Sequence, residues 1–102
     1  MDIEREILET DILIVGAGPA GLAVAHKLMQ LIEADGDMEV PEILVMEKGS
    51  HVGAHALSGA VMDPKGLKEL IPDFVEKEAP LEAEVKSDAM YYLSESGSMK
   101  FP

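Results

Sequence analysis

Residues 11–21, which read DILIVGAGPAG, decide the fold of this chain. Residues 11–15 form an almost continuous aliphatic run, which is typical of a parallel strand buried on both faces. Gly16, Gly18 and Gly21 follow at the GxGxxG spacing, which joins a strand to a helix in dinucleotide-binding domains. The stretch therefore predicts a buried strand, a glycine turn and a helix, in that order.

Each glycine of this turn has a separate physical role. Gly16 permits the tight turn, Gly18 lets backbone N–H groups approach a pyrophosphate, and Gly21 lets the helix lie close to the strand. Pro19 and Ala20 begin the helix, whose positive dipole end favours a diphosphate. We therefore predict a pyrophosphate site made by Gly16, Gly18, Pro19, Ala20 and Gly21.

The residues after the turn complete a strand, helix and strand unit. Apolar positions recur at helical spacing from Pro19 to about residue 32, and residues 33–41 are acidic with glycine and proline, as in a loop. A second aliphatic run at residues 43–46 predicts a second parallel strand. The expected fold class is α/β, a partial Rossmann-like FAD/NAD(P)-binding domain.

Glu47 closes the second strand, at the place where the adenosine ribose lies in such domains. Its carboxylate can accept hydrogen bonds from both ribose hydroxyls and would repel a 2′-phosphate. Glu47 follows the glycines by more than the usual ~20 residues of sequence. The acidic loop at residues 33–41 accounts for the additional residues. The competing interpretation is a solvated carboxylate at a strand end.

The second half of the chain has weaker patterns. Residues 48–62 are rich in glycine and predict a loop, with room for one short helix. Asp63 and Pro64 predict the start of a helix that ends before Pro72. Residues 90–93 and 98–101 predict the strands of a carboxy-terminal β-hairpin, in which one of two adjacent tyrosines is buried.

Composition limits the classes of partner. The 102 residues hold 20 acidic and 8 basic side chains, a formal net charge of −12, which argues against nucleic acid. Cysteine is absent, so these residues supply neither a disulfide nor ligands to an iron–sulfur cluster. The first residues, MDIEREILETD, lack the basic and apolar regions of a secretory signal and are too acidic for a mitochondrial transit peptide. No apolar run in the sequence reaches the ~18–20 residues that span a bilayer.

Three longer runs carry a family resemblance. These are ETDILIVGAGPAGLAVAHKL, EILVMEKGSHVGAHALSGAVMDPKGLKELIPDF and APLEAEVKSDAMYYL. Together they resemble the amino-terminal part of the electron transfer flavoprotein:ubiquinone oxidoreductase family, over nearly the whole chain. GAGPAGL occurs in many FAD enzymes, whereas GAHALSGAVMDP followed by KELIPDF is specific to a much smaller group of proteins.

The resemblance implies an oxidoreductase that passes electrons from reduced electron transfer flavoprotein, through FAD and a [4Fe-4S] cluster, to ubiquinone or menaquinone. It implies that Lys48 lies at the edge of the adenosine site and that the FAD runs along Gly53, His55, Ser58 and Gly59. Related enzymes often have paired glycines where this chain has Gly53-Ala54. The resemblance therefore does not predict a close contact between FAD and the backbone of residue 54. No catalytic residue is expected, because the cofactor carries the chemistry.

The same resemblance sets the expected domain organisation. Residues 1–102 correspond to the amino-terminal portion of an FAD-binding domain in a larger enzyme, and the cluster ligands and quinone site lie outside them. The full protein is expected in a bacterial or archaeal cytoplasm, peripheral on the inner face of the cell membrane. By themselves the 102 residues are expected to be inactive and to retain little FAD, and either to self-associate or to have a mobile carboxy-terminal region.

Two other functions stay open at this point. One is an FAD-dependent reductase of the geranylgeranyl reductase-like type, and the other is a nucleotide-binding module without chemistry. A metal site is not expected, although His51 and His55 are four residues apart, because no cysteine or well-placed carboxylate completes a ligand set. An ordinary polar role is the alternative to an FAD contact for His55.

Overall fold

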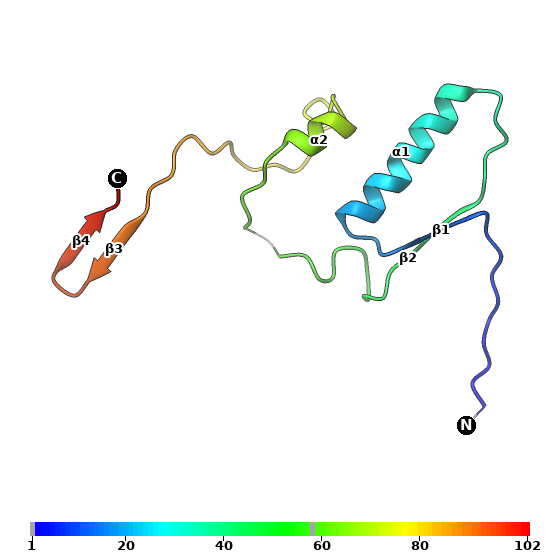
Figure 1. Cartoon of the computed structure of the whole chain (residues 1–102), viewed down its shortest axis with the longest axis horizontal. Coiled ribbons are helices and arrows are strands. Elements are labelled where there is room, and N and C mark those ends of the chain that lie inside the picture. Colours follow the sequence, from blue (N-terminus) through cyan, green and yellow to red (C-terminus); the bar gives the residue numbers. More distant parts are fainter. Residues whose placement is uncertain (1, 58) are drawn as a thin grey trace. The chain divides into compact units, whose positions relative to one another are not determined.

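The computed structural model describes residues 2–57 and 59–102. The elements follow the order β1, α1, β2, α2, β3 and β4 (Figure 1). The chain divides into two compact units, residues 1–60 and residues 61–102. The first unit contains the glycine turn and Glu47, and the second contains the hairpin.

The first unit is a parallel βαβ arrangement, as the sequence predicts. β1 (Ile12–Val15) pairs with β2 (Ile43–Met46), and α1 (Pro19–Asp35) connects them. The register places Ile12 opposite Ile43 and Val15 opposite Met46, so both strands end at the same level. The turn after β1 and the residue after β2 therefore meet at one edge of the sheet.

α1 is longer than the sequence pattern predicts. The helix ends at Asp35, three residues beyond the expected end near Ile32, so residues 33–35 are not loop. Their acidic composition indicated a loop, but Glu and Ala are good helix formers and continue the helix. Gly36 ends it with a positive φ of 73° and donates its N–H to the carbonyl oxygen of Ile32 (3.3 Å).

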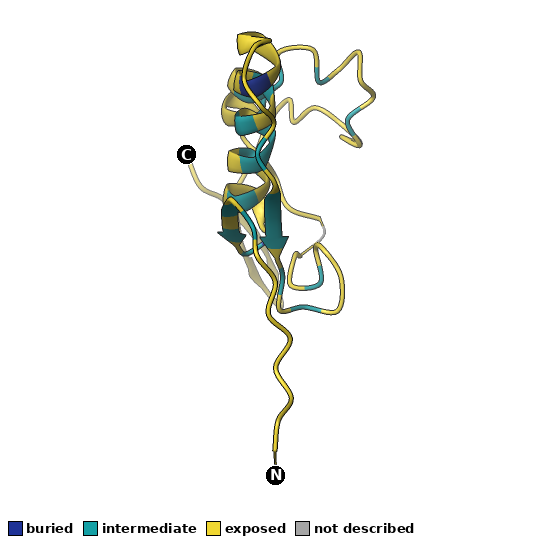
Figure 2. Ribbon diagram, turned by 90° about the vertical axis from the view of Figure 1, so that its right-hand side faces the viewer, coloured by how far each residue is buried: buried dark blue, intermediate teal, exposed yellow. Residues whose placement is uncertain are grey.

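The core of the first unit lies between α1 and one face of the sheet. Figure 2 shows half-buried residues along the helix and the strands, and Ile32 is buried at 7% exposure. On β1, Ile12 and Ile14 are half-buried, whereas Leu13 and Val15 are 50% and 79% exposed. The prediction that this strand is buried on both faces is therefore wrong within the described residues, because one crossover helix covers one face only.

The second unit has little buried surface. α2 (Lys65–Leu70) begins after Asp63, whose carboxylate accepts the N–H of Lys65 at 3.0 Å, and ends before Pro72 as predicted. β3 (Tyr91–Ser94) and β4 (Gly97–Lys100) form the predicted antiparallel hairpin, each one residue out of the predicted bounds.

The expected burial of one tyrosine in the hairpin is wrong. Both Tyr91 and Tyr92 are exposed, and so are all other residues of the two strands. Alternation places the two rings on opposite faces, but no second layer of the described unit covers either face. The sequence pattern shows which side chains share a face and does not show what covers it.

Candidate dinucleotide-binding site

The glycine turn leaves open space where a ligand would approach the main chain. Gly16 has a φ of 101°, a region that favours glycine, and its N–H donates to the carbonyl oxygen of Met46 at 2.7 Å. A Cβ atom built on Gly18 meets no atom within 4 Å. Gly18 is the N-cap of α1 and Pro19 is at its first position. No side chain of the described residues caps this first turn, so its N–H groups suit an anion.

Gly21 permits close packing of α1 on β1, as predicted. A Cβ atom at this position would collide with the carbonyl oxygen of Gly16 and would lie 3.3 Å from Cγ2 of Ile14. The obstructing group is main chain, so it cannot move aside by changing rotamer. Gly21 thereby fixes the distance between the helix terminus and the strand end.

Glu47 lies across the edge of the sheet from the glycine turn. Its Oε2 accepts the N–H of Ala17 at 3.0 Å, and its Oε1 accepts the N–H of Gly49 at 2.9 Å. The side chain is part-buried rather than fully solvated. Each carboxylate oxygen has two lone pairs, so one acceptor position per oxygen is available to a ribose hydroxyl.

The pKa of Glu47 is lowered from its ordinary value. The N–H of Gly49 is the largest cause and the N–H of Ala17 the second, and partial desolvation opposes them by raising the pKa. The electrostatic interaction with His55 lowers the pKa of Glu47 further, as does the N–H of Lys48. Glu47 is therefore ionised at neutral pH and accepts hydrogen bonds in its charged form.

The residues expected farther along the cofactor belong to the segment between β2 and α2. Lys48 and His55 are exposed. Gly53 and Gly59 have positive φ values of 88° and 74°, so the chain turns sharply at both. Ser58 lies outside the described residues. Roles for these five residues along the cofactor stay predictions.

Two contributors to the site were not named from the sequence. Ala17 and Gly49 act through their backbone N–H groups, which no side-chain pattern reveals. A Cβ atom at Gly49 would lie 3.0 Å from Cβ of Ala54 and 3.3 Å from Oε1 of Glu47. Small side chains are therefore favoured where this loop folds back beside Glu47.

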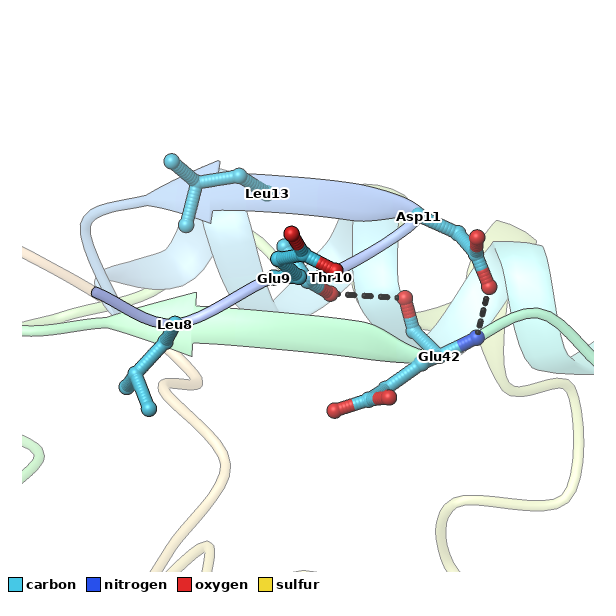
Figure 3. Close-up of a pocket in the computed structure, with 6 residues that line it drawn as sticks. All are labelled: Leu8, Glu9, Thr10, Asp11, Leu13 and Glu42. Carbon is cyan, nitrogen blue, oxygen red and sulfur yellow. Dashed lines mark hydrogen bonds between the residues drawn. The ribbon is translucent and has the colours of Figure 1, made fainter.

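A separate shallow hollow lies at the amino ends of the strands (Figure 3). Thr10 donates its hydroxyl to the carbonyl oxygen of Glu42 at 2.9 Å, and Asp11 accepts the N–H of Glu42 at 2.8 Å. Its lining includes three carboxylates, those of Glu9, Asp11 and Glu42. This hollow is at the opposite strand ends from the glycine turn, and its charge repels phosphate, so it does not suit a dinucleotide.

Among residues 2–57 and 59–102, no group of three or more histidine, aspartate or glutamate side chains is placed to hold a metal ion. His51 instead lies with its Nδ1 2.9 Å from the hydroxyl oxygen of Ser50. No helix within the described part of the chain is both long and apolar enough to cross a membrane.

Residues 14–74, more than half of the chain, match the family described as NAD(P)-binding Rossmann-like domain. The chain belongs to this family. The matched stretch runs from within β1 to the turns after α2 and includes the glycine turn and Glu47. The α/β fold class is thereby confirmed.

This Rossmann-like chain is also similar to the amino-terminal region of larger curated proteins. It is 56% identical over 99 residues to the electron transfer flavoprotein-ubiquinone oxidoreductase, mitochondrial, of Dictyostelium discoideum, covering 96% of this chain and 16% of that protein. The corresponding Pseudomonas aeruginosa protein is 50% identical over 96 residues, 94% of this chain and 17% of the relative. The Sus scrofa protein is 44% identical over 103 residues, 100% of this chain and 16% of the relative.

These relatives confirm the resemblance stated from the sequence. Their names describe oxidoreductases, and the family match and those names support a flavin or nicotinamide nucleotide as cofactor. The chain spans about a sixth of the length of these relatives.

Proposed function

We propose that residues 1–102 are the amino-terminal portion of an FAD-binding domain. In this proposal the turn at residues 16–21 and Glu47 bind the ADP half of FAD. The observation that carries this proposal is the meeting of three features at one sheet edge. These are the open space at Gly18, the uncapped start of α1, and the ionised carboxylate of Glu47. A diphosphate fits the first two, and ribose hydroxyls fit the third.

FAD and NAD share the ADP half, so the turn alone does not choose between them. The choice of FAD rests on the similarity to electron transfer flavoprotein-ubiquinone oxidoreductases, which extends beyond the turn over nearly the whole chain. In this proposal Lys48 lies at the edge of the adenosine site. Gly53, His55, Ser58 and Gly59 line the path of the remaining cofactor.

The complete protein, in this proposal, is an electron-transferring-flavoprotein dehydrogenase. It takes electrons from reduced electron transfer flavoprotein and delivers them through FAD and a [4Fe-4S] cluster to ubiquinone or menaquinone. The 102 residues contain no cysteine, so the cluster is held by residues outside them. We place the complete protein on the inner face of a bacterial or archaeal cell membrane as a peripheral protein.

The exposed sheet face supports a longer domain. Leu13 and Val15 on β1 and Met46 on β2 are all at least half exposed, and a parallel sheet is normally covered on both faces. Further parts of the domain would cover this face in the complete protein. In the isolated 102 residues, the bare apolar surface is expected to cause self-association.

A nucleotide titration of the ¹⁵N-labelled chain tests the ADP site. ADP is expected to shift the amide resonances of Gly18, Ala20 and Gly21. Adenosine 2′,5′-bisphosphate should bind more weakly than AMP, which differs from it only in lacking the 2′-phosphate that Glu47 repels. Shifts confined to the hollow beside Glu42, or equal affinity for AMP and the bisphosphate, would contradict the assignment.

A second experiment addresses FAD itself in the complete protein. Glu47→Gln keeps the shape of the side chain and removes its charge, so the dissociation constant of FAD should rise. Titration of the apoprotein with FAD, followed by flavin absorbance, measures this constant. Glu42→Gln is the matched control, since it removes one charge at the opposite end of β2. Equal FAD affinity for both variants would remove Glu47 from the site.

A further inference from the structure

The carboxylate of Glu47 connects two parts of the chain through the protein's own groups. Oε2 accepts the N–H of Ala17, thirty residues earlier, and Oε1 accepts the N–H of Gly49, two residues later. Ala17 belongs to the pyrophosphate turn, and Gly49 belongs to the loop that follows β2. One side chain therefore holds the main chain on both sides of the proposed ribose position.

The bond to Ala17 is important because this residue is buried. Ala17 is 3% exposed, one of two apolar residues in the described chain that are buried. A buried N–H group without an acceptor is costly, since water cannot replace the lost partner. The neighbouring N–H of Gly16 donates to the carbonyl oxygen of Met46 in the sheet, whereas that of Ala17 depends on a side chain.

We propose that Glu47 is a positioning residue for the nucleotide site in addition to its ribose contact. Its ionised carboxylate sets the main chain of the pyrophosphate turn and of the loop at Gly49, so that the N–H groups of the turn are oriented for a diphosphate. The nucleotide part of this proposal rests on the proposed function, but the bonds themselves do not.

The two roles of Glu47 are compatible at the level of atoms. Each oxygen uses one lone pair for a backbone N–H and keeps one for a ribose hydroxyl. A glutamine at this position has one carbonyl oxygen and one NH₂ group, which is only a donor. With either amide orientation, Ala17 or Gly49 would face a donor and lose its acceptor.

Amide hydrogen exchange in the chain without nucleotide tests the positioning role directly. In Glu47→Gln, exchange at Ala17 or Gly49 should be several-fold to about tenfold faster than in the unsubstituted chain, the range expected for one hydrogen bond. Glu42→Gln should leave both amides unchanged. Unchanged exchange at both amides in Glu47→Gln would overturn the proposal, whatever its effect on nucleotide binding.

An acid titration of the unsubstituted chain gives a test that needs no variant. The pKa of Glu47 is lowered from its ordinary value of 4.5, so the stabilisation is present above that value and is lost as pH falls through the lowered pKa. Protection at Ala17 and Gly49 should fall in that range. The N–H of Gly16, which donates to a carbonyl oxygen, is the internal control, and parallel loss at all three amides would overturn the proposal.

A nucleotide without ribose hydroxyls separates the positioning role from the ribose contact. If Glu47 positions the turn, Glu47→Gln should bind 2′,3′-dideoxy-ADP several-fold more weakly than the unsubstituted chain does. A variant that binds ADP more weakly but dideoxy-ADP equally well would overturn the positioning role and leave the proposed function intact. Weaker binding of both nucleotides, with the larger loss for ADP, supports the two roles together.

Discussion

Substitution of Gly21 by alanine tests how closely α1 must lie on β1. The new Cβ would collide with the carbonyl oxygen of Gly16 and would crowd Cγ2 of Ile14 at 3.3 Å. Overpacking of this kind costs about 1–3 kcal/mol, and the upper end applies because the obstacle is main chain. Alanine in place of glycine within a helix gains about 1 kcal/mol. The net expectation is a loss of about 2 kcal/mol.

Amide exchange by NMR measures this loss within the first unit. A loss of about 2 kcal/mol corresponds to roughly thirtyfold faster exchange through opening of α1 and β1. Gly66→Ala is the control, because Gly66 lies in α2 and its added Cβ meets nothing within 4 Å. That substitution should slow exchange in α2, through the helix propensity alone. A Gly21→Ala chain as stable as the original would refute the close-packing role.

Three further predictions concern the cofactor and the second unit. Gly18→Val should keep the fold, since the Cβ position is open, but the complete protein should purify without flavin absorbance; a yellow variant would contradict the pyrophosphate assignment. Glu78 has a φ of 56° and closes a turn in which the N–H of Ala79 donates to the carbonyl oxygen of Phe74 at 3.0 Å. Glu78→Gly should stabilise this turn by about 0.5 kcal/mol, because the relieved backbone strain exceeds the entropy cost of glycine by that amount. Amide exchange at Ala79 should therefore be slower in the variant. Exchange at Ala79 that is faster in the variant would show that φ is not strained there. The isolated 102 residues should bind little FAD and reduce no quinone, and a monomer by light scattering with stoichiometric flavin and quinone reductase activity would reverse the proposed domain organisation.

The elements of the first unit were predictable because their signals are local. The aliphatic runs of β1 and β2 and the glycines between them each have one strong structural interpretation. The end of α1 was less predictable, since Glu33 and Asp35 suit both a loop and a helix end. Only the backbone conformation of Gly36 places the boundary.

The network around Glu47 was predictable only in part. The position of its carboxylate follows from the strand end and from the parallel pairing. The bonds to Ala17 and Gly49 depend on where two backbone N–H groups point, and residue identity does not encode that direction. Likewise, the alternation of Tyr91 and Tyr92 gives their faces, while burial depends on neighbours that a hairpin alone does not supply.

The two backbone bonds of Glu47 constrain how the proposed ADP site can evolve a different nucleotide preference. Acceptance of a 2′-phosphate calls for lysine or arginine where the carboxylate stands, but both side chains are donors only. The buried N–H of Ala17 would then be left without its acceptor at the moment that specificity changed. A second substitution that offers an oxygen to Ala17 must come first or at the same time. The order of mutations is therefore restricted by epistasis, and a single exchange at residue 47 should lose one cofactor without gaining the other.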